Sequence, residues 1–132
     1  MNFYLDIDGV LLVNERFASS GADEFLQKVL GKYPDSTYWL TTHCWRGENR
    51  AVEILTPVLK PETVQLLHKI KPTEWGEWKT DAIDFDKPFV WLDDDLFDQE
   101  RAELAKHNAL KNWVEVDLHK NPKQIKELTE KI

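Results

Sequence analysis

The chain has 132 residues, of which 42% are hydrophobic, and its 17 Lys and Arg residues against 24 Asp and Glu residues give a formal net charge of −7. This length predicts a single globular domain over residues 1–132, and the acidic balance argues against broad binding of nucleic acid. The only cysteine, Cys44, excludes an internal disulfide and a multi-cysteine zinc site and fits a reducing compartment.

The N-terminal stretch MNFYLDIDG lacks the basic segment and the apolar segment of a secretory signal, and no apolar run is long enough to span a bilayer. The sequence contains no internal repeat, low-complexity tract or linker. We therefore expect a soluble, cytoplasmic protein that does not bind membranes.

Short apolar runs alternate with amphipathic segments along the whole chain. In chain order, we expect a strand over residues 3–5, a helix over 22–30, a strand over 37–40, a helix over 48–59, a short helical piece over 79–83, a strand over 89–92, a helix from 95 to about 107, a strand over 113–116 and a last helix whose apolar stripe runs from 125 to 132. Ser20 and Asp95 are the expected N-caps of two of these helices. The segment KPETVQLLHKIKP is ambiguous.

Strands that alternate with helices predict an α/β protein with a parallel, Rossmann-like sheet and right-handed crossovers. Helices on both faces of the sheet make this a three-layer α/β/α sandwich. In such folds, ligands bind at the carboxyl ends of the strands.

Polar residues follow three of the predicted strands, in the pairs Asp6 and Asp8, Thr41 and Thr42, and Asp93 and Asp94. The expected fold brings all of them to one edge of the sheet. Side chains alternate along an extended chain, so Asp6 and Asp8 should point to the same side and share one small space. Carboxylates gathered in this way repel one another unless a cation or a shared proton intervenes, and Mg²⁺ is the obvious partner.

A calcium-binding loop is the competing interpretation of the first acids. Counted from Asp6, that loop needs a glycine where Leu11 stands and an acid where Phe17 stands. The calcium interpretation therefore fails.

Four short motifs in order, DIDGV, YWLTT, EWKTDAI and VWLDDD, resemble the four motifs of the haloacid dehalogenase (HAD) superfamily. The resemblance spans residues 3–98, and the strand and helix that follow also fit. Within the superfamily, the chain is most similar to the small HAD domains found alone or in RNA-repair proteins. This resemblance implies a phosphatase that works through an aspartyl-phosphate intermediate.

The resemblance implies that Asp6 is the nucleophile and that Asp8 is the general acid and base. It also implies that Mg²⁺ is bound by Asp6, by the backbone carbonyl of Asp8, and by Asp93 or Asp94. A carboxylate nucleophile needs no deprotonation at neutral pH, and the covalent step divides a difficult displacement into two easier ones.

The phosphate-binding residues implied by the resemblance are Thr41, through its hydroxyl, Thr42, through its backbone N–H, and Lys79. Thr41 is preferred over Thr42 because it directly follows the apolar run. Lys79 is preferred over Lys71 and Lys87 because it stands at the head of a helical piece, whereas Lys71 precedes a proline and Lys87 abuts a strand.

Other polar residues near these motifs have structural explanations. Asp95 and Asp98 have the spacing of an N-cap and an N3 acid. A nucleophilic pair of His43 and Cys44 is not expected, because neighbours in a loop need not face each other, although they could contact substrate.

The six tryptophans fall into two groups. Trp39, Trp91 and Trp113 lie in predicted strands and should belong to the core. The other three, in segments that flank the site, could stack on a base or line a partner surface, or merely cover the edge of the sheet; they are Trp45, Trp75 and Trp78.

The connections between the motifs are too short for a large cap domain, so we expect an open site. An open site suits a phosphorylated substrate such as a nucleotide, a nucleic-acid end or a phosphoprotein, and a second copy of the chain in a homo-oligomer could serve as a lid. One alternative is a receiver-like signalling domain, which the order of the motifs disfavours because the DxD pair comes first here. Another is a non-catalytic module that binds phosphate and Mg²⁺.

Overall fold

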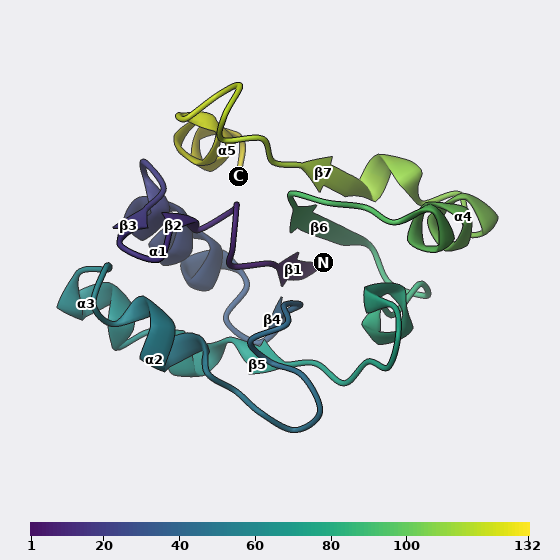
Figure 1. Cartoon of the computed structure of the whole chain (residues 1–132), viewed down its shortest axis with the longest axis horizontal. Helices are drawn as coiled ribbons and strands as arrows, with labels where there is room; N and C mark the ends of the chain where they lie inside the picture. Colours follow the sequence, from purple (N-terminus) through teal and green to yellow (C-terminus); the bar gives the residue numbers. More distant parts are fainter.

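The computed structural model describes residues 1–132 and contains a five-stranded sheet flanked by helices (Figure 1). The strands lie in the order β5-β4-β1-β6-β7, and every neighbouring pair is parallel. Their bounds are β1 Asn2–Leu5, β4 Thr37–Trp39, β5 Lys71–Pro72, β6 Phe89–Asp93 and β7 Trp113–Glu115. The α/β class and the parallel sheet are confirmed, and the arrangement is compatible with a Rossmann-like fold.

The chain also contains five α-helices and three short 3₁₀ helices, of which α5 follows the last strand. The α-helices are α1 Ala22–Lys32, α2 Ala51–Leu55, α3 Pro61–Val64, α4 Asp98–Lys106 and α5 Gln124–Lys131. The 3₁₀ helices are η1 Leu67–Lys69, η2 Lys79–Ala82 and η3 Leu110–Asn112. None of the helices combines the length and the apolar character that crossing a membrane requires.

The central strand β1 is buried on both faces, and its alternating side chains join two separate hydrophobic clusters. Leu5 belongs to the larger cluster, with Phe25 of α1, whereas Tyr4 belongs to the smaller one, with Leu104 of α4. Figure 1 shows α1 and α4 on opposite sides of the sheet. Burial of both faces explains why β1 reads as a continuous apolar run.

The region between β4 and β6 differs most from expectation. The predicted helix over residues 48–59 is limited to α2, which begins after residues 48–50 and ends early because Pro57 cannot continue the helical hydrogen bonds. The ambiguous segment that follows forms α3, η1 and the edge strand β5. A small antiparallel hairpin after β1, with β2 at Leu12–Asn14 and β3 at Phe17–Ala18, was not predicted.

Both predicted N-caps are wrong. The N-cap of α1 is Gly21, at φ 80°, and not Ser20. Helix α4 begins at Asp98 after its N-cap Phe97, because Asp95 instead belongs to the preceding loop, where its Oδ1 accepts a hydrogen bond from the Leu96 N–H at 2.9 Å.

Candidate functional site

Three carboxylates meet where β1 and β6 end, because these two strands are hydrogen-bonded neighbours in register. Asp6 follows β1, Asp93 ends β6, and Asp94 is the next residue. One carboxylate oxygen from each lies within 4.8 Å of the others. Asp6 and Asp93 are buried and Asp94 is exposed, so the group, called here the acid cluster, opens to solvent on one side.

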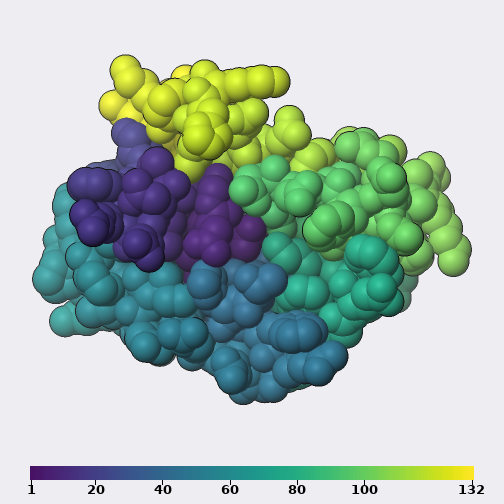
Figure 2. Space-filling view, in the orientation of Figure 1, coloured from purple at the N-terminus to yellow at the C-terminus, as the bar shows by residue number.

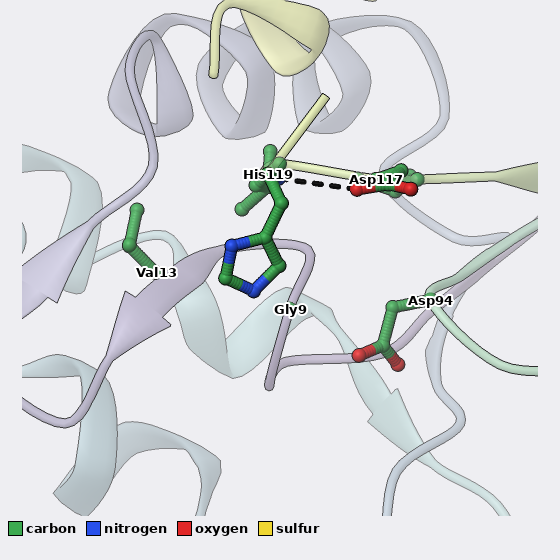
Figure 3. A pocket seen from close by; sticks show the side chains of 7 residues that line it. Gly9, Val13, Asp94, Asp117 and His119 are labelled. Carbon is green, nitrogen blue, oxygen red and sulfur yellow. Dashed lines mark hydrogen bonds between the residues drawn. The ribbon is translucent and has the colours of Figure 1, made fainter. Parts of the chain in front are cut away.

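The turn at Gly9 allows Asp94 to approach the loop that follows β1. Gly9 has φ 76°, a conformation that side chains disfavour, and a Cβ built on it would collide with the carboxylate of Asp94. Figure 3 shows Asp94 beside this turn, in a pocket of about 250 Å³ that His119 also lines. The glycine of the DxDG motif is therefore required by the packing of the site as well as by the turn.

Lys79 is the cation of the acid cluster. Its Nζ lies 2.7 Å from Oδ2 of Asp93 and 3.6 Å from Oδ1 of Asp6. Lys71, in contrast, donates to the backbone carbonyl of Asp35 at 3.2 Å. The lysine preferred from the sequence is thus the one that the structure brings to the acids.

Glu100 of α4 holds Lys79 in position, and the sequence did not identify it. Its Oε2 accepts the backbone N–H of Lys79 at 2.9 Å, and its Oε1 accepts the N–H of Phe97 at 3.0 Å. Its position three residues after Phe97, the pattern of an N3 acid, is a signal that could have revealed it once the helix start was placed correctly. Burial raises its pKa.

Burial and mutual repulsion raise the pKa of each carboxyl group in the acid cluster. Burial and then the charge of Asp6 raise the pKa of Asp93 to about 7. Burial, followed by the hydrogen bond and the charge of Asp93, raises the pKa of Asp94 to about 6. Burial also raises the pKa of Asp6, against the opposing attraction of Lys79. The cluster therefore favours uptake of protons or of a cation.

The same cluster also raises the pKa of Lys79, and here the rise favours the charged form. Burial alone would lower the pKa of this ammonium group, but the negative charges of Asp6 and Asp93 outweigh burial and raise it. Lys79 is therefore charged at neutral pH, and one positive charge faces three acidic groups.

Asp8 lies apart from the acid cluster, contrary to the expectation that it shares one small space with Asp6. Its side chain is 65% exposed, and its Oδ2 lies 2.8 Å from Nε2 of His43. Because the backbone turns at Gly9, the strand-like alternation that would align the two acids does not continue beyond Asp6. Ligation of a metal through the backbone carbonyl of Asp8 stays a prediction.

His43 is therefore a further candidate, which the sequence suggested only as a substrate contact. No pattern in the sequence around His43 predicts its contact with Asp8, because the two residues are far apart in the chain and meet only when it folds. Cys44 is buried, and its thiol donates to Oδ1 of Asn49 at 3.1 Å, so it does not pair with His43.

The two threonines after β4 have different positions. Thr41, the preferred phosphate ligand, is fully buried, and its hydroxyl accepts the backbone N–H of His43 at 3.3 Å. Thr42 is exposed and lines the pocket over the acid cluster. The structure thus gives Thr41 a role in ordering the loop and leaves Thr42 facing the site.

A pocket of about 220 Å³, called here the acid pocket, holds most of the predicted site residues. Its polar lining consists of Asp6, Asp8, Thr42, Glu77, Lys79, Asp93, Asp94, Asp95 and Glu100, and Trp75 and Phe97 complete it. Three carboxylates around one lysine suit a hard cation and an anion with several oxygens.

The tryptophans divide largely as expected. Trp39 and Trp91 are fully buried, and Trp113 is partly buried. Trp75 lines the acid pocket, and Trp45 lines an adjoining cleft. Trp78 packs against Phe97, with ring centroids 5.9 Å apart.

Comparisons with models of protein families, with curated proteins and with solved structures found no match.

Proposed function

We propose that this protein is a Mg²⁺-dependent phosphatase of the HAD type, which hydrolyses a phosphomonoester through an aspartyl-phosphate on Asp6. The observation that carries the proposal is the acid cluster with Lys79 bound into it, 3.6 Å from Asp6. The α/β class and the parallel sheet support the finer assignment of a three-layer α/β/α sandwich without a large cap domain.

The donor set fits Mg²⁺. Asp6, Asp93 and Asp94 offer carboxylate oxygens, the ligands that this ion prefers. Burial is the largest cause of their raised pKa values, and a divalent cation would offset the cost of keeping the three groups ionised there. Bound there, Mg²⁺ would offset the negative charge that develops on the oxygens of the transferred phosphoryl group.

In the first step, a carboxylate oxygen of Asp6 attacks phosphorus while the bond from phosphorus to the ester oxygen breaks. Asp8, in its protonated form, donates a proton to the leaving oxygen, so the product departs as an alcohol. The ammonium group of Lys79 stabilises charge on Asp6 and on the phosphoryl oxygens. Thr42 faces the same pocket and can donate its hydroxyl or N–H to the phosphate.

In the second step, the carboxylate of Asp8 accepts a proton from a water molecule as the water oxygen attacks phosphorus. The acyl-phosphate bond breaks, inorganic phosphate leaves, and Asp6 regains its carboxylate. Asp8 is then protonated again, ready for the next cycle. Its exposure, at 65% of the side chain, suits contact with both water and a leaving group.

An open entrance is part of the proposal. The segment between β1 and α1 contains only the small hairpin β2-β3, and the segment between β4 and η2 contains only short helices and an edge strand. Such an entrance suits a phosphate at the end of a larger molecule, such as a nucleotide, a nucleic-acid end or a phosphoprotein, and a second copy of the chain could cover it.

The test is hydrolysis of p-nitrophenyl phosphate by the purified protein, with Mg²⁺ and with EDTA. We expect turnover that requires Mg²⁺ and falls to background in Asp6→Asn, which keeps the size of the side chain and removes the nucleophile. Asp35→Asn is the matched control, because Asp35 is exposed near the amino end of β4, at the opposite edge of the sheet. Absence of turnover on a broad panel of phosphates, together with no affinity for phosphate or Mg²⁺, would refute the proposal.

A further inference from the structure

A second cleft adjoins the acid pocket. It has a volume of about 530 Å³ and is lined by Thr42, Trp45, Arg46, Trp75, Gly76 and Glu77. Three of these residues, Thr42, Trp75 and Glu77, also line the acid pocket. The two hollows therefore share one wall, and a ligand held by the acid cluster can reach along it into the second one, called here the tryptophan cleft.

One of the two indole rings of the tryptophan cleft, that of Trp45, is held in place by the backbone. Nε1 of Trp45 donates to the carbonyl oxygen of Gly76 at 3.1 Å, which ties the loop after β4 to the loop before η2. The rings of Trp45 and Trp75 are tilted by 41°, with centroids 5.9 Å apart. In Figure 2, the blue surface around residues 40–50 adjoins the teal-green surface around residues 70–80. The ring of Trp45 is therefore positioned before any ligand binds, and it lies against the ring of Trp75.

Arg46 adds a positive charge to this cleft. Its guanidinium carbon lies 4.2 Å from the centroid of the Trp45 ring. Arg46 and Lys79 are the only Lys or Arg residues that line either hollow, and Arg46 is the one in the tryptophan cleft. Because a guanidinium group attracts anions and stacks on planar groups, the tryptophan cleft suits a planar or anionic part of a ligand.

We propose that the tryptophan cleft binds the nucleobase of a phosphorylated nucleoside whose terminal phosphate lies at the acid cluster. This inference rests on the proposed phosphatase function and specifies its substrate class. Every nucleobase has a π face that stacks on an aromatic side chain. Thr42 and Glu77, on the shared wall, provide hydrogen-bonding groups for the sugar between base and phosphate.

The separation of the two hollows favours a nucleotide over a phosphorylated tyrosine. In an aryl phosphate, the ring is bonded directly to the ester oxygen and would lie inside the acid pocket. In a nucleotide, the sugar separates the phosphate from the base, and the residues shared by the two hollows, Thr42, Trp75 and Glu77, separate the acid cluster from Trp45, which lines only the tryptophan cleft. A free mononucleotide and the terminal nucleotide of an oligonucleotide share this chemistry.

The kinetic test compares Trp45→Leu, which removes the aromatic surface, with Trp45→Phe, which keeps one. For each, kcat/KM is measured for a nucleoside monophosphate, for a terminally phosphorylated oligonucleotide and for glycerol phosphate. We expect Trp45→Leu to lower the ratio of kcat/KM for the nucleotide to kcat/KM for glycerol phosphate about tenfold, mainly by raising KM for the nucleotide. Trp45→Phe should keep this ratio close to that of the unchanged protein. Phe17→Leu is the control, since Phe17 is 64% exposed and lines neither hollow.

A larger effect of Trp45→Leu on the mononucleotide identifies the free nucleotide as the source, and a larger effect on the oligonucleotide identifies a nucleic-acid end. An unchanged ratio for both, while glycerol phosphate is still hydrolysed, would overturn the nucleobase inference and leave the phosphatase proposal intact.

Binding of an unphosphorylated nucleoside gives a readout that is independent of turnover. We expect adenosine to quench the tryptophan fluorescence of the intact protein, with less quenching in Trp45→Leu. Quenching without turnover of any phosphate would support the cleft and count against the phosphatase proposal. No quenching by adenosine or by a nucleoside monophosphate would overturn the inference even if Trp45→Leu failed to fold.

Discussion

The carboxyl group of Asp8 has one protein partner, the imidazole of His43, 2.8 Å away. In the proposed reaction, Asp8 must hold a proton, release it and take up another. The contact with the imidazole restrains this carboxyl group at the acid pocket, and the backbone N–H of His43 is itself held by the hydroxyl of Thr41. His43 is thus a positioning residue for Asp8.

We predict that His43→Ala lowers kcat about tenfold, because the exposed side chain of Asp8 loses the contact that orients it. Added imidazole should restore part of the activity, since the side chain of His43 is 24% exposed and its place is open to a small molecule. Both effects are measured with p-nitrophenyl phosphate.

His68→Ala is the matched control for His43, because His68 is exposed and bonds only to the backbone carbonyl of Gln65. An unchanged kcat in His43→Ala would show that Asp8 needs no such partner. Loss of activity that imidazole does not restore would indicate a structural role instead.

At the scale of elements, helix α4 and the 3₁₀ helix η2 are joined by the side chain of Glu100. It accepts one backbone N–H from the start of each, at Phe97 and at Lys79. Lys79 precedes β6 in the sequence and α4 follows β6, so the backbone of Lys79 is fixed by a side chain from a helix that comes later in the chain. Glu100 is only 2% exposed, and both of these hydrogen bonds are part-buried.

We predict that Glu100→Ala lowers the free energy of unfolding by roughly 1–3 kcal/mol, because two part-buried N–H groups lose their acceptor. It should also lower phosphatase activity, since Lys79 loses the anchor of its backbone. Glu100→Gln, which keeps one amide oxygen as acceptor, should have a smaller effect on both. Urea denaturation measures the first change and phosphate release the second.

The control for Glu100 is Glu103→Ala on the same helix, because Glu103 is 40% exposed and pairs only with His107. Equal losses of stability in Glu100→Ala and Glu103→Ala would contradict the role assigned to Glu100.

At the scale of the whole molecule, the acid cluster links stability to pH and to metal. The pKa of Asp93 rises from 3.8 to about 7 on folding, and that of Asp94 rises from 3.8 to about 6. At pH values between 3.8 and about 7, the folded chain therefore binds more protons than the unfolded chain. The contribution of these two groups to stability is therefore complete below about pH 4 and is lost as pH rises through 6 and 7.

We predict that Mg²⁺ raises the Tm of the protein and that this increase is larger at pH 8 than at pH 5, because protons compete with the metal for the same carboxylates. At a concentration one hundred times its Kd, a ligand that binds only the folded state adds about 2.7 kcal/mol. Thermal unfolding in EDTA and in Mg²⁺ at several pH values measures the effect.

Asp93→Asn should reduce both the pH dependence in EDTA and the gain from Mg²⁺, whereas Asp35→Asn should change neither. A gain from Mg²⁺ that did not vary between pH 5 and pH 8 would contradict the link between the acid cluster and the metal.

The sequence by itself determined the α/β class, the central strands and the place of the acids, because each depends on local pattern. A strand buried on both faces, such as β1, requires a continuous apolar run, and the acids at the ends of β1 and β6 follow those runs directly. Lys79 was also identified, from its place at the head of η2.

Only the tertiary structure decided which groups face one another in the site. The pairing of Asp8 with His43, the two hydrogen bonds of Glu100 and the meeting of Trp45 with Trp75 join segments far apart in the chain, and no local pattern marks such contacts. Helix α4 also begins at Asp98 and not at the predicted residue 95, since Asp95 accepts a hydrogen bond within the loop after β6. Loops at the carboxyl edge take their shape from packing on one another, so the details of the site depend on the assembled fold.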